Sequence, residues 1–285
     1  MSKADTPPVA TAMPAAQEGA PSADYVAWLR KERMRHLGVR GTQVAILFVF
    51  LVMWEILPRA QLVNPMLTSY PSALWPTFLD LMQDKPQQSN IFVHTWGTVF
   101  ATMVGFTAAM VIGTIVAAIL WWWESLYEIL DPYLVVANAM PKTAFVPIFY
   151  IWLGAAGSIY AMALAISVFI TILMIYSGFQ GVDPNKIKLA QTFGATRWQV
   201  LSKVVLPGSV PTMIATLKVN TGLSLVGVVV GEFQSASIGL GYLIQYGSQI
   251  FKLNIVMTAI TILAIVSSLM YLAIHWLEAA VMKRR

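Results

Sequence analysis

The sequence predicts an all-α integral membrane protein, because of its composition, its uncharged stretches and the places of its basic residues. Of its 285 residues, 58% are hydrophobic and 11% are charged, whereas an ordinary soluble domain is about 25% charged. Residues 95–123 carry no charge and exceed the length of about 20 residues that a helix needs to cross a bilayer. The net charge of +5 comes from basic residues beside apolar stretches, as the positive-inside rule expects. It therefore does not indicate nucleic-acid binding.

The first forty residues differ from the rest of the chain. Residues 1–23 are rich in Ala, Pro, Ser and Gly and predict a disordered tail. They do not resemble a secretory signal, since no apolar core follows a short basic start. Residues 24–40 interleave aromatic and basic side chains, which favours a basic amphipathic helix at the membrane surface. Residues 41–285 form the predicted transmembrane domain.

Six spans are predicted, with both termini in the cytoplasm because of the basic flanks at 30–40 and 283–285. Between the first two spans we expect an external loop, 58–93, with a short helix at 72–82. In chain order, the first two predicted spans cover 42–57 and 95–123, and the third begins near residue 130. The fourth covers 159–179, the fifth 210–231 and the sixth 254–277. The fifth span contains Gly227 and Gly231, a GxxxG spacing that permits close helix approach.

The third span should be broken. Pro141 and Pro147 make a straight helix unfavourable, and broken helices at membrane depth occur where the backbone lines protein or a water-filled path. Residues 154–158, GAAGS, are expected to turn the chain at the outer face.

The long polar segment 182–207 should form two short helices with a break between them. Asp183 and Pro184 are typical of a helix start, and Gly194 is typical of a helix end because Gly tolerates a positive φ. Thr196, with Gln199 three residues on, predicts a capping box that opens the next helix. Pro207 stops or kinks that helix.

This segment resembles the "EAA" loop of the permease subunits of bacterial ABC importers. Five residues fall in register with that pattern: Ala190, Gly194, Val204, Leu206 and Pro207. Lys188 and Leu189 replace the first two residues of its Glu-Ala-Ala. We therefore expect the same docking geometry as in the family, while the individual contacts stay open. An ordinary amphipathic loop helix is the alternative.

Two further segments resemble the nitrate, sulfonate and taurine branch of these permeases. One carries a Pro-Lys pair at 141–142, then Ala144, Pro147 and Trp-Leu-Gly at 152–154. The other is Gly-Leu-Gly-Tyr-Leu-Ile at 239–244, expected as an outer re-entrant or surface segment. The resemblance covers roughly residues 90–280, and the first ninety residues match only in layout.

The resemblance implies a type I ABC importer permease-like fold, with a cytoplasmic coupling helix between spans 4 and 5. It implies a homodimer in the bacterial inner membrane, two cytoplasmic ABC ATPase subunits, an extracytoplasmic solute-binding protein and a small, often anionic, solute. The sequence contains no GxxxxGK[ST] motif, so ATP and Mg²⁺ are expected on the partner ATPase. No cofactor is expected on this chain, and it is expected not to be an enzyme.

A set of residues in the polar segment is predicted to contact the ATPase, with the short helix as a rigid lever. The apolar members would fill a cleft on the partner, and the small ones would let the backbone approach closely. The alternative is that Leu189 and Phe193 pack against the chain's own helices. The predicted set is Lys188, Leu189, Ala190, Phe193, Gly194, Ala195 and Trp198.

Ionisable residues inside a membrane are costly and usually functional. Lys218 lies within the fifth span, and Thr221 and Ser224 share roughly its helix face, so these three are predicted beside the translocation pathway, together with Asn138. The alternative is that Lys218 snorkels and pairs with a lipid headgroup or a neighbouring helix end. Glu55 and Glu232, the other two membrane-embedded ionisable residues, sit at span ends where they can reach water, so the alternative to a functional role is solvation at the interface.

Other functional classes find less support. The chain has no cysteine, its three histidines are scattered, and a metal site or catalytic constellation is not expected. The open alternative is an ATP-independent secondary transporter, or a membrane enzyme. A secondary transporter would favour buried carboxylates and internal repeats, and neither is evident in the sequence.

Overall fold

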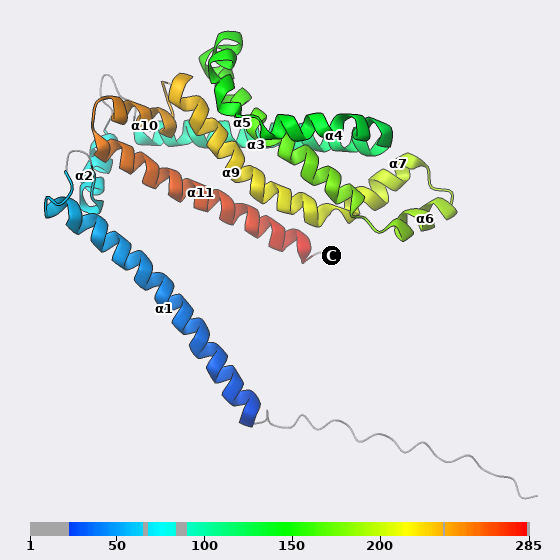
Figure 1. Ribbon diagram of the computed structural model, residues 1–285, viewed down its shortest axis with the longest axis horizontal. Coiled ribbons are helices and arrows are strands. Elements are labelled where there is room, and N and C mark those ends of the chain that lie inside the picture. Colours follow the sequence, from blue (N-terminus) through cyan, green and yellow to red (C-terminus); the bar gives the residue numbers. More distant parts are fainter. Residues whose placement is uncertain (1–22, 65–67, 84–89, 236, 284–285) are drawn as a thin grey trace, which may run out of the picture. The chain divides into compact units, whose positions relative to one another are not determined.

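The computed structural model describes residues 23–64, 68–83, 90–235 and 237–283, and all the regular structure in these ranges is helical. The chain divides into two compact units, 1–54 and 55–285. Its helices are, in order, α1 (Ala23–Arg59), α2 (Pro71–Leu81), α3 (Ile91–Trp122), α4 (Glu124–Ala139), η1 (Lys142–Phe145), α5 (Val146–Gln180), α6 (Pro184–Thr192), α7 (Arg197–Val200), η2 (Leu201–Val205), α8 (Leu206–Gly208), α9 (Val210–Ser235), α10 (Leu240–Gln249) and α11 (Leu253–Met282) (Figure 1).

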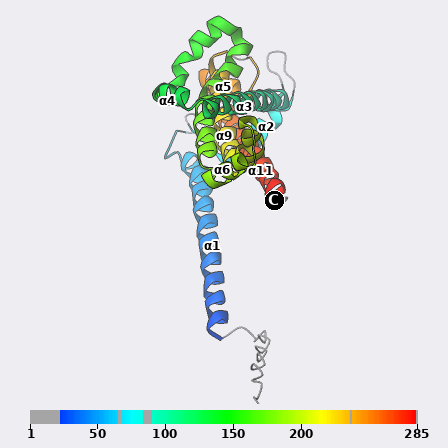
Figure 2. The same ribbon diagram turned by 90° about the vertical axis from the view of Figure 1, so that its right-hand side faces the viewer.

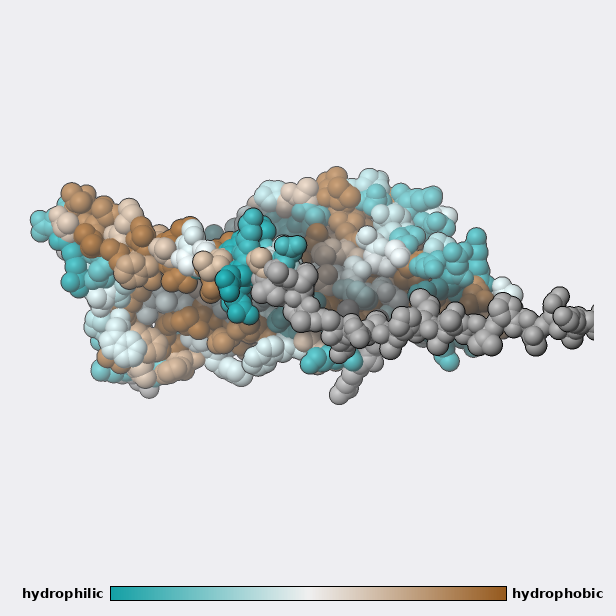
Figure 3. All heavy atoms as spheres, turned by 90° about the horizontal axis from the view of Figure 1, so that it is seen from below, coloured by the Kyte–Doolittle hydropathy of each residue, from teal (hydrophilic) through white to brown (hydrophobic). Residues whose placement is uncertain are grey.

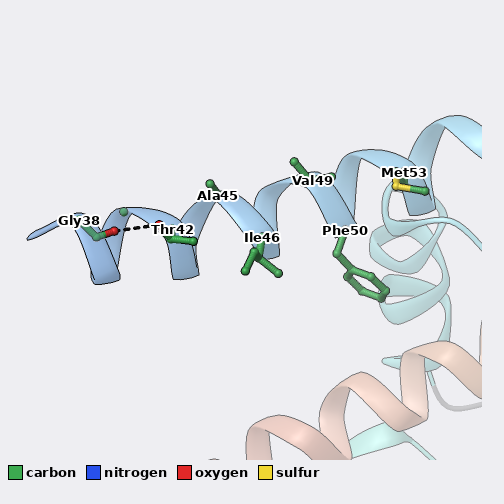
Figure 4. A pocket seen from close by; sticks show the side chains of 8 residues that line it. Gly38, Thr42, Ala45, Ile46, Val49, Phe50 and Met53 are labelled. Carbon is green, nitrogen blue, oxygen red and sulfur yellow. Dashed lines mark hydrogen bonds between the residues drawn. The ribbon is translucent and has the colours of Figure 1, made fainter. Parts of the chain in front are cut away.

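The N-terminal unit is dominated by α1. The predicted tail lies outside the described residues, apart from residue 23, which begins α1. No break separates the predicted surface helix, 24–40, from the predicted first span, because one helix covers both. A hollow on one face of α1 is lined by this helix alone, and its one polar contact is a hydrogen bond of 3.0 Å from Thr42 Oγ1 to Gly38 O (Figure 4). No converging polar groups mark it as a site.

Five helices among the described residues are long and apolar enough to cross a membrane, one fewer than predicted. They cover 30–59, 91–122, 142–180, 210–234 and 253–281. The predicted third span is absent from this group because α4 has 16 residues, too few for an apolar crossing of about 30 Å. Its charged residues, Glu124, Glu128 and Asp131, lie in its first half.

The region of the predicted third span consists of three short pieces: α4, η1 and the first part of α5. After α4, Met140 and Pro141 are extended or irregular, and η1 follows. Gly154 then has φ 72° and ψ −178°, which divides α5 into two helices. This confirms the expected break in the third span and places the turn expected at 154–158 at its first residue. Figure 1 shows α5 bending sharply near its beginning.

The centre of the larger unit is the packing of α5 against α9 and α3. A Cβ added at Gly227 would lie 2.6 Å from Ala163 Cα, and one at Gly231 would lie 2.8 Å from Ile159 Cα. Real Cβ atoms do not approach other atoms this closely. The GxxxG spacing therefore does what the sequence predicted: it lets α9 approach α5 backbone to backbone. Figure 2 shows these helices gathered at the centre of the unit.

Two apolar clusters lie toward opposite ends of this bundle (Figure 1). The α6-end cluster consists of Ala117, Leu120, Ile172, Ile175, Tyr176, Phe179, Val182, Val200, Leu201 and Val205. The α10-end cluster consists of Leu81, Ile91, Leu240, Leu243, Ile255 and Ala259. In the space-filling view, hydrophilic side chains gather at the end where α6 lies, and apolar side chains cover much of the remaining visible face (Figure 3).

Candidate functional site

The segment 182–207 has the local structure that its sequence predicts. Asp183 caps α6 by accepting a hydrogen bond of 2.9 Å from the amide of Asn185. Gly194 has φ 79°, a value that a branched or bulky residue adopts only with strain. The capping box at the start of α7 is present in both directions between Thr196 and Gln199. Helix, break and helix are therefore confirmed.

The segment is fixed to the bundle by apolar packing. Val182, Val200, Leu201 and Val205 belong to the α6-end cluster, together with residues of α3 and α5. The guanidinium of Arg197 also lies 5.6 Å from the ring centre of Trp122 at the end of α3, a favourable cation–π distance. Both ends of the segment are thus anchored, and α6 lies between them.

The residues predicted to contact a partner divide into two groups. Leu189 is 58% exposed, Phe193 83% and Trp198 62%, and Lys188 is exposed as well. Ala190 and Ala195 instead pack against the α6-end cluster. Within this chain, the alternative that Leu189 and Phe193 pack against the chain's own helices is therefore wrong, and the side chains that do pack there are the two alanines. An apolar trio left in solvent at a rigid surface is typical of an interaction site.

A cleft of about 460 Å³ lies on the cluster side of α6. Its walls come from α3, α4, α5, α6 and α7, and it is lined by Trp121, Glu124, Gln180, Ile187, Gln191, Ala195, Arg197 and Val200. This lining combines charged, amide and apolar side chains, in contrast to the exposed apolar side chains of Leu189, Phe193 and Trp198. The segment therefore offers a partner two chemically different surfaces.

Lys218, predicted beside a pathway, is paired with a residue of a neighbouring helix. Its Nζ lies 2.6 Å from Glu278 Oε2 on α11. The same carboxylate oxygen lies 3.3 Å from His275 Nδ1. This is the neighbouring-helix contact that the alternative interpretation of Lys218 expected. The sequence did not single out Glu278, which lies beyond the predicted end of the sixth span.

The polar residues that follow Lys218 lie in the helix packing. Thr221 and Ser224 are buried, and Ser224 Oγ lies 3.3 Å from Ser167 Oγ on α5. Asn220, fully buried, donates to Thr171 Oγ1 and lies 3.1 Å from Met110 Sδ. These contacts join α9 to α5 and α3, and they are the interhelical hydrogen bonds expected inside a bilayer.

Asn138 lies in α4, apart from the three α9 residues with which it was grouped. It is half-buried, and its carbonyl oxygen accepts a hydrogen bond of 2.6 Å from Lys142 Nζ. The ammonium of Lys142 also lies 5.7 Å from the ring centre of Phe169. The structure therefore links Asn138 to the broken region after α4 rather than to Lys218.

The two remaining membrane acids have different surroundings. Glu55 accepts from the amide of Ser72 at 3.0 Å and pairs with Arg59 at 2.6 Å, so it lies at an accessible end, as expected. Glu232 is only 2% exposed, which corrects the expectation that it reaches water. It accepts hydrogen bonds from Thr98 Oγ1 and from the amide of Gly241. The sequence signal for this was the Gly-Leu-Gly segment at 239–241, which begins seven residues after the acid.

No group of three or more His, Asp or Glu side chains that could hold a metal ion occurs among the residues that the structure describes.

Comparison with known proteins decides the family. A family model described as "Binding-protein-dependent transport system inner membrane component" matches residues 109–285. The chain belongs to this family. The matched residues include the segment 182–207 and the helices α9 and α11, which pack against each other.

Curated relatives match most of the chain. The taurine transport system permease protein TauC of Escherichia coli is 25% identical over 237 residues, which cover 82% of this chain and 86% of TauC. The putative aliphatic sulfonates transport permease SsuC of Bacillus subtilis is 24% identical, with 83% and 85% covered. The formylaminopyrimidine transport permease ThiX of Halalkalibacterium halodurans is 27% identical, with 81% and 90% covered. This permease therefore groups with the taurine and sulfonate branch.

Solved structures of ABC transporters share the fold. The MetNI methionine ABC transporter in an inward-facing conformation aligns with a TM-score of 0.62 at 19% identity, covering 70% of this chain and 99% of the other. An amino acid ABC transporter aligns with a TM-score of 0.56 at 17% identity. At these identities, the likeness establishes the arrangement of helices and nothing finer.

Proposed function

We propose that this chain is the membrane-spanning subunit of an ATP-driven importer, with α6 as the helix that docks on the ATPase. The observation that carries this proposal is the exposed apolar trio Leu189, Phe193 and Trp198 on a segment anchored at both ends. Rigid anchoring matters because a lever transmits motion only if it does not deform. Lys188 and Gly194 belong to the same proposed surface, and Ala190 and Ala195 support it from behind.

The proposed assembly contains two copies of this permease, two ABC ATPase subunits and an extracytoplasmic solute-binding protein. ATP and Mg²⁺ are bound by the ATPase in this proposal. The α6 end faces the cytoplasm, and the α10 end faces the binding protein. Family membership and the likeness to ABC transporter folds support this assembly, and the basic residues at 30–40 support cytoplasmic termini.

The proposed solute is small and carries an anionic group, such as a sulfonate, taurine, nitrate or bicarbonate. The names of two relatives support the sulfonate class, whereas a third is named for formylaminopyrimidine transport. The proposed pathway runs beside α9 at Lys218, whereas Thr221 and Ser224 are buried within the bundle and Asn138 contacts Lys142. In this proposal Lys218 exchanges its partner, Glu278, for the anion as the helices move.

The docking proposal is tested by binding of the cognate ABC ATPase. Phe193→Ala and Leu189→Ala should each weaken ATPase binding about tenfold, since apolar anchors at the centre of an interface dominate its energy. Lys186→Ala, an exposed residue on the same helix, is the matched control and should bind like wild type. All three variants should keep the melting temperature of the permease, because none of these side chains is buried in the chain.

The measurement is co-purification from detergent, with the amount of ATPase bound per permease as readout. Wild-type binding by Phe193→Ala and Leu189→Ala would show that α6 is not the docking helix.

A further inference from the structure

The first turn of α10 is capped by side chains of other helices. The amide nitrogens of residues 239, 240 and 241 lie 3.0, 2.8 and 2.8 Å from three acceptors: His94 Nδ1, Thr98 Oγ1 and Glu232 Oε2. The first two acceptors are one turn apart on α3, and the third is in the last turns of α9. The first amides of a helix have no acceptor within that helix. Here side chains of α3 and α9 supply the acceptors. We call these three side chains the α10 clamp.

The clamp is buried and closely packed. His94, Thr98 and Glu232 are each at most 2% exposed. Thr98 Oγ1 also donates to the Glu232 carboxylate, at 2.8 Å from Oε1. A Cβ added at Gly241 would lie 2.8 Å from Glu232 Cβ, so this glycine is needed for the approach. The positive end of the α10 dipole further favours a carboxylate at this point.

The clamp lies at the C-terminal end of α9, the helix that follows the segment 182–207. The chain runs from α7 through η2 and α8 directly into α9. The 26 residues of α9 extend about 39 Å at 1.5 Å per residue. Glu232 lies three residues before its end. If α9 is displaced at the α6 end, the contact of Glu232 with Gly241 therefore moves the first turn of α10 as well.

We propose that Glu232, Thr98 and His94 are positioning residues that make α10 move with α9 and α3 during transport, so that the α10 end responds to the ATPase. This inference rests on the proposed function. Apolar packing alone would hold α10 in place, since Leu240 and Leu243 belong to the α10-end cluster. A buried carboxylate costs free energy unless its partners are well placed. Since apolar packing already holds α10, the buried Glu232 carboxylate indicates that the N-terminus of α10 needs a fixed geometry.

The same argument makes the proposal testable, because the apolar contacts should keep α10 folded when the clamp is removed. Glu232→Ala and Thr98→Val each remove an acceptor. Glu232→Gln keeps the connectivity, since the Gln carbonyl can accept from Gly241 while its amide donates to Thr98 Oγ1. Thr102→Val is the matched control for Thr98→Val: Thr102 is fully buried one turn further along α3, and its hydroxyl bonds to Thr98 O.

The first readout needs only the purified permease. Hydrogen exchange of the amides at 239–241 should be slow in wild type, Glu232→Gln and Thr102→Val, and at least about tenfold faster in Glu232→Ala and Thr98→Val. Unchanged exchange in the last two variants would show that the clamp does not hold α10. This result is independent of whether the chain is an importer subunit.

The second readout uses the permease reconstituted with its ATPase and binding protein. Glu232→Ala and Thr98→Val should keep ATPase binding and ATP hydrolysis within about twofold of wild type but lower taurine or sulfonate uptake about tenfold, as loss of coupling between two sites does. Glu232→Gln and Thr102→Val should transport normally. Full uptake by the two clamp variants, or a parallel loss of hydrolysis and uptake in them, would overturn the positioning role. Absence of ATP-driven uptake in wild type would instead overturn the proposed function.

Discussion

Lys218 of α9 and Glu278 of α11 form an ion pair, with Lys218 Nζ 2.6 Å from Glu278 Oε2. Both side chains are partly exposed, at 25% and 30%. His275, one turn before Glu278, approaches the same oxygen at 3.3 Å. Membrane-embedded charges are expected to pair with each other, and a polar contact between membrane helices contributes about 1 kcal/mol. The pair therefore joins α9 to α11 and also holds a cation where a pathway is proposed.

The first prediction separates these two roles of Lys218. If the ammonium receives an anionic solute, Lys218→Gln should lower uptake about tenfold, the scale of one hydrogen bond to a charged group. Lys218→Arg should retain most of the uptake. Glu278→Gln removes the competing carboxylate and should leave uptake near that of wild type. The measurement is initial uptake rate in reconstituted vesicles, with ATPase binding as the control.

A structural role predicts a different pattern for the same variants. Lys218→Gln and Glu278→Gln would then lower the melting temperature and the uptake alike, and the double variant would lose less than the sum of the two, as residues in contact do. That result would contradict the pathway role. Equal uptake by wild type and Lys218→Gln would contradict it as well.

The local structure around 182–207 could be predicted because each signal there acts over a few residues. Asp183, Gly194 and the Thr196–Gln199 pair fix their own backbone through hydrogen bonds and φ values. Which side chains face the bundle depends on contacts with α3 and α5, and these are distant in sequence. Leu189 and Ala190 are neighbours on α6, yet only Ala190 packs against the α6-end cluster.

The partners of buried polar groups could not be predicted from the sequence for the same reason. Glu232 bonds to Thr98, 134 residues away, so its place near a span end suggested water instead. The predicted number of spans also differs from the structure at the third span. Pro141 and Pro147 were predicted to interrupt the helix and residues 154–158 to turn the chain, but the sequence did not show that α4 would end after 16 residues.

The second prediction concerns topology, which can be tested by cysteine labelling because the native chain has no cysteine. Phe193 and Phe251 are 83% and 80% exposed, and they lie near α6 and α10. In intact cells, an impermeant maleimide should label Phe251→Cys and should label Phe193→Cys only after the membrane is opened. Labelling of Phe193→Cys from outside would contradict the proposed orientation.

The third prediction concerns the packing of α9 on α5. A methyl group at Gly227 would collide with the backbone of residues 162 and 163, whereas nothing lies within 4 Å of one at Gly222 on the same helix. Gly227→Ala should therefore destabilise the permease by about 1–3 kcal/mol, the scale of overpacking. Gly222→Ala should be neutral or slightly stabilising, since Ala favours helix. Thermal unfolding in detergent is the measurement, and equal melting temperatures would show that the close approach is not needed.

The fourth prediction concerns the supporting face of α6. Ala190→Asp places a charge against the α6-end cluster and should lower the stability of the permease alone, by about 1–3 kcal/mol. Lys188→Asp, on the exposed side of the helix, should leave the melting temperature unchanged. A melting temperature of Ala190→Asp equal to that of wild type would contradict the packing of α6 against the bundle.

The source of energy for transport is the central claim, and uptake by the reconstituted permease tests it most directly. Vesicles that contain the permease, its ATPase and internal ATP, with binding protein and labelled taurine outside, should accumulate taurine or a related sulfonate. Accumulation should persist when ionophores collapse all ion gradients and should stop when ATP is omitted. It should fall when Phe193→Ala replaces the wild-type permease. Uptake by the permease alone, driven by an ion gradient without ATP or ATPase, would contradict the account and establish a secondary transporter.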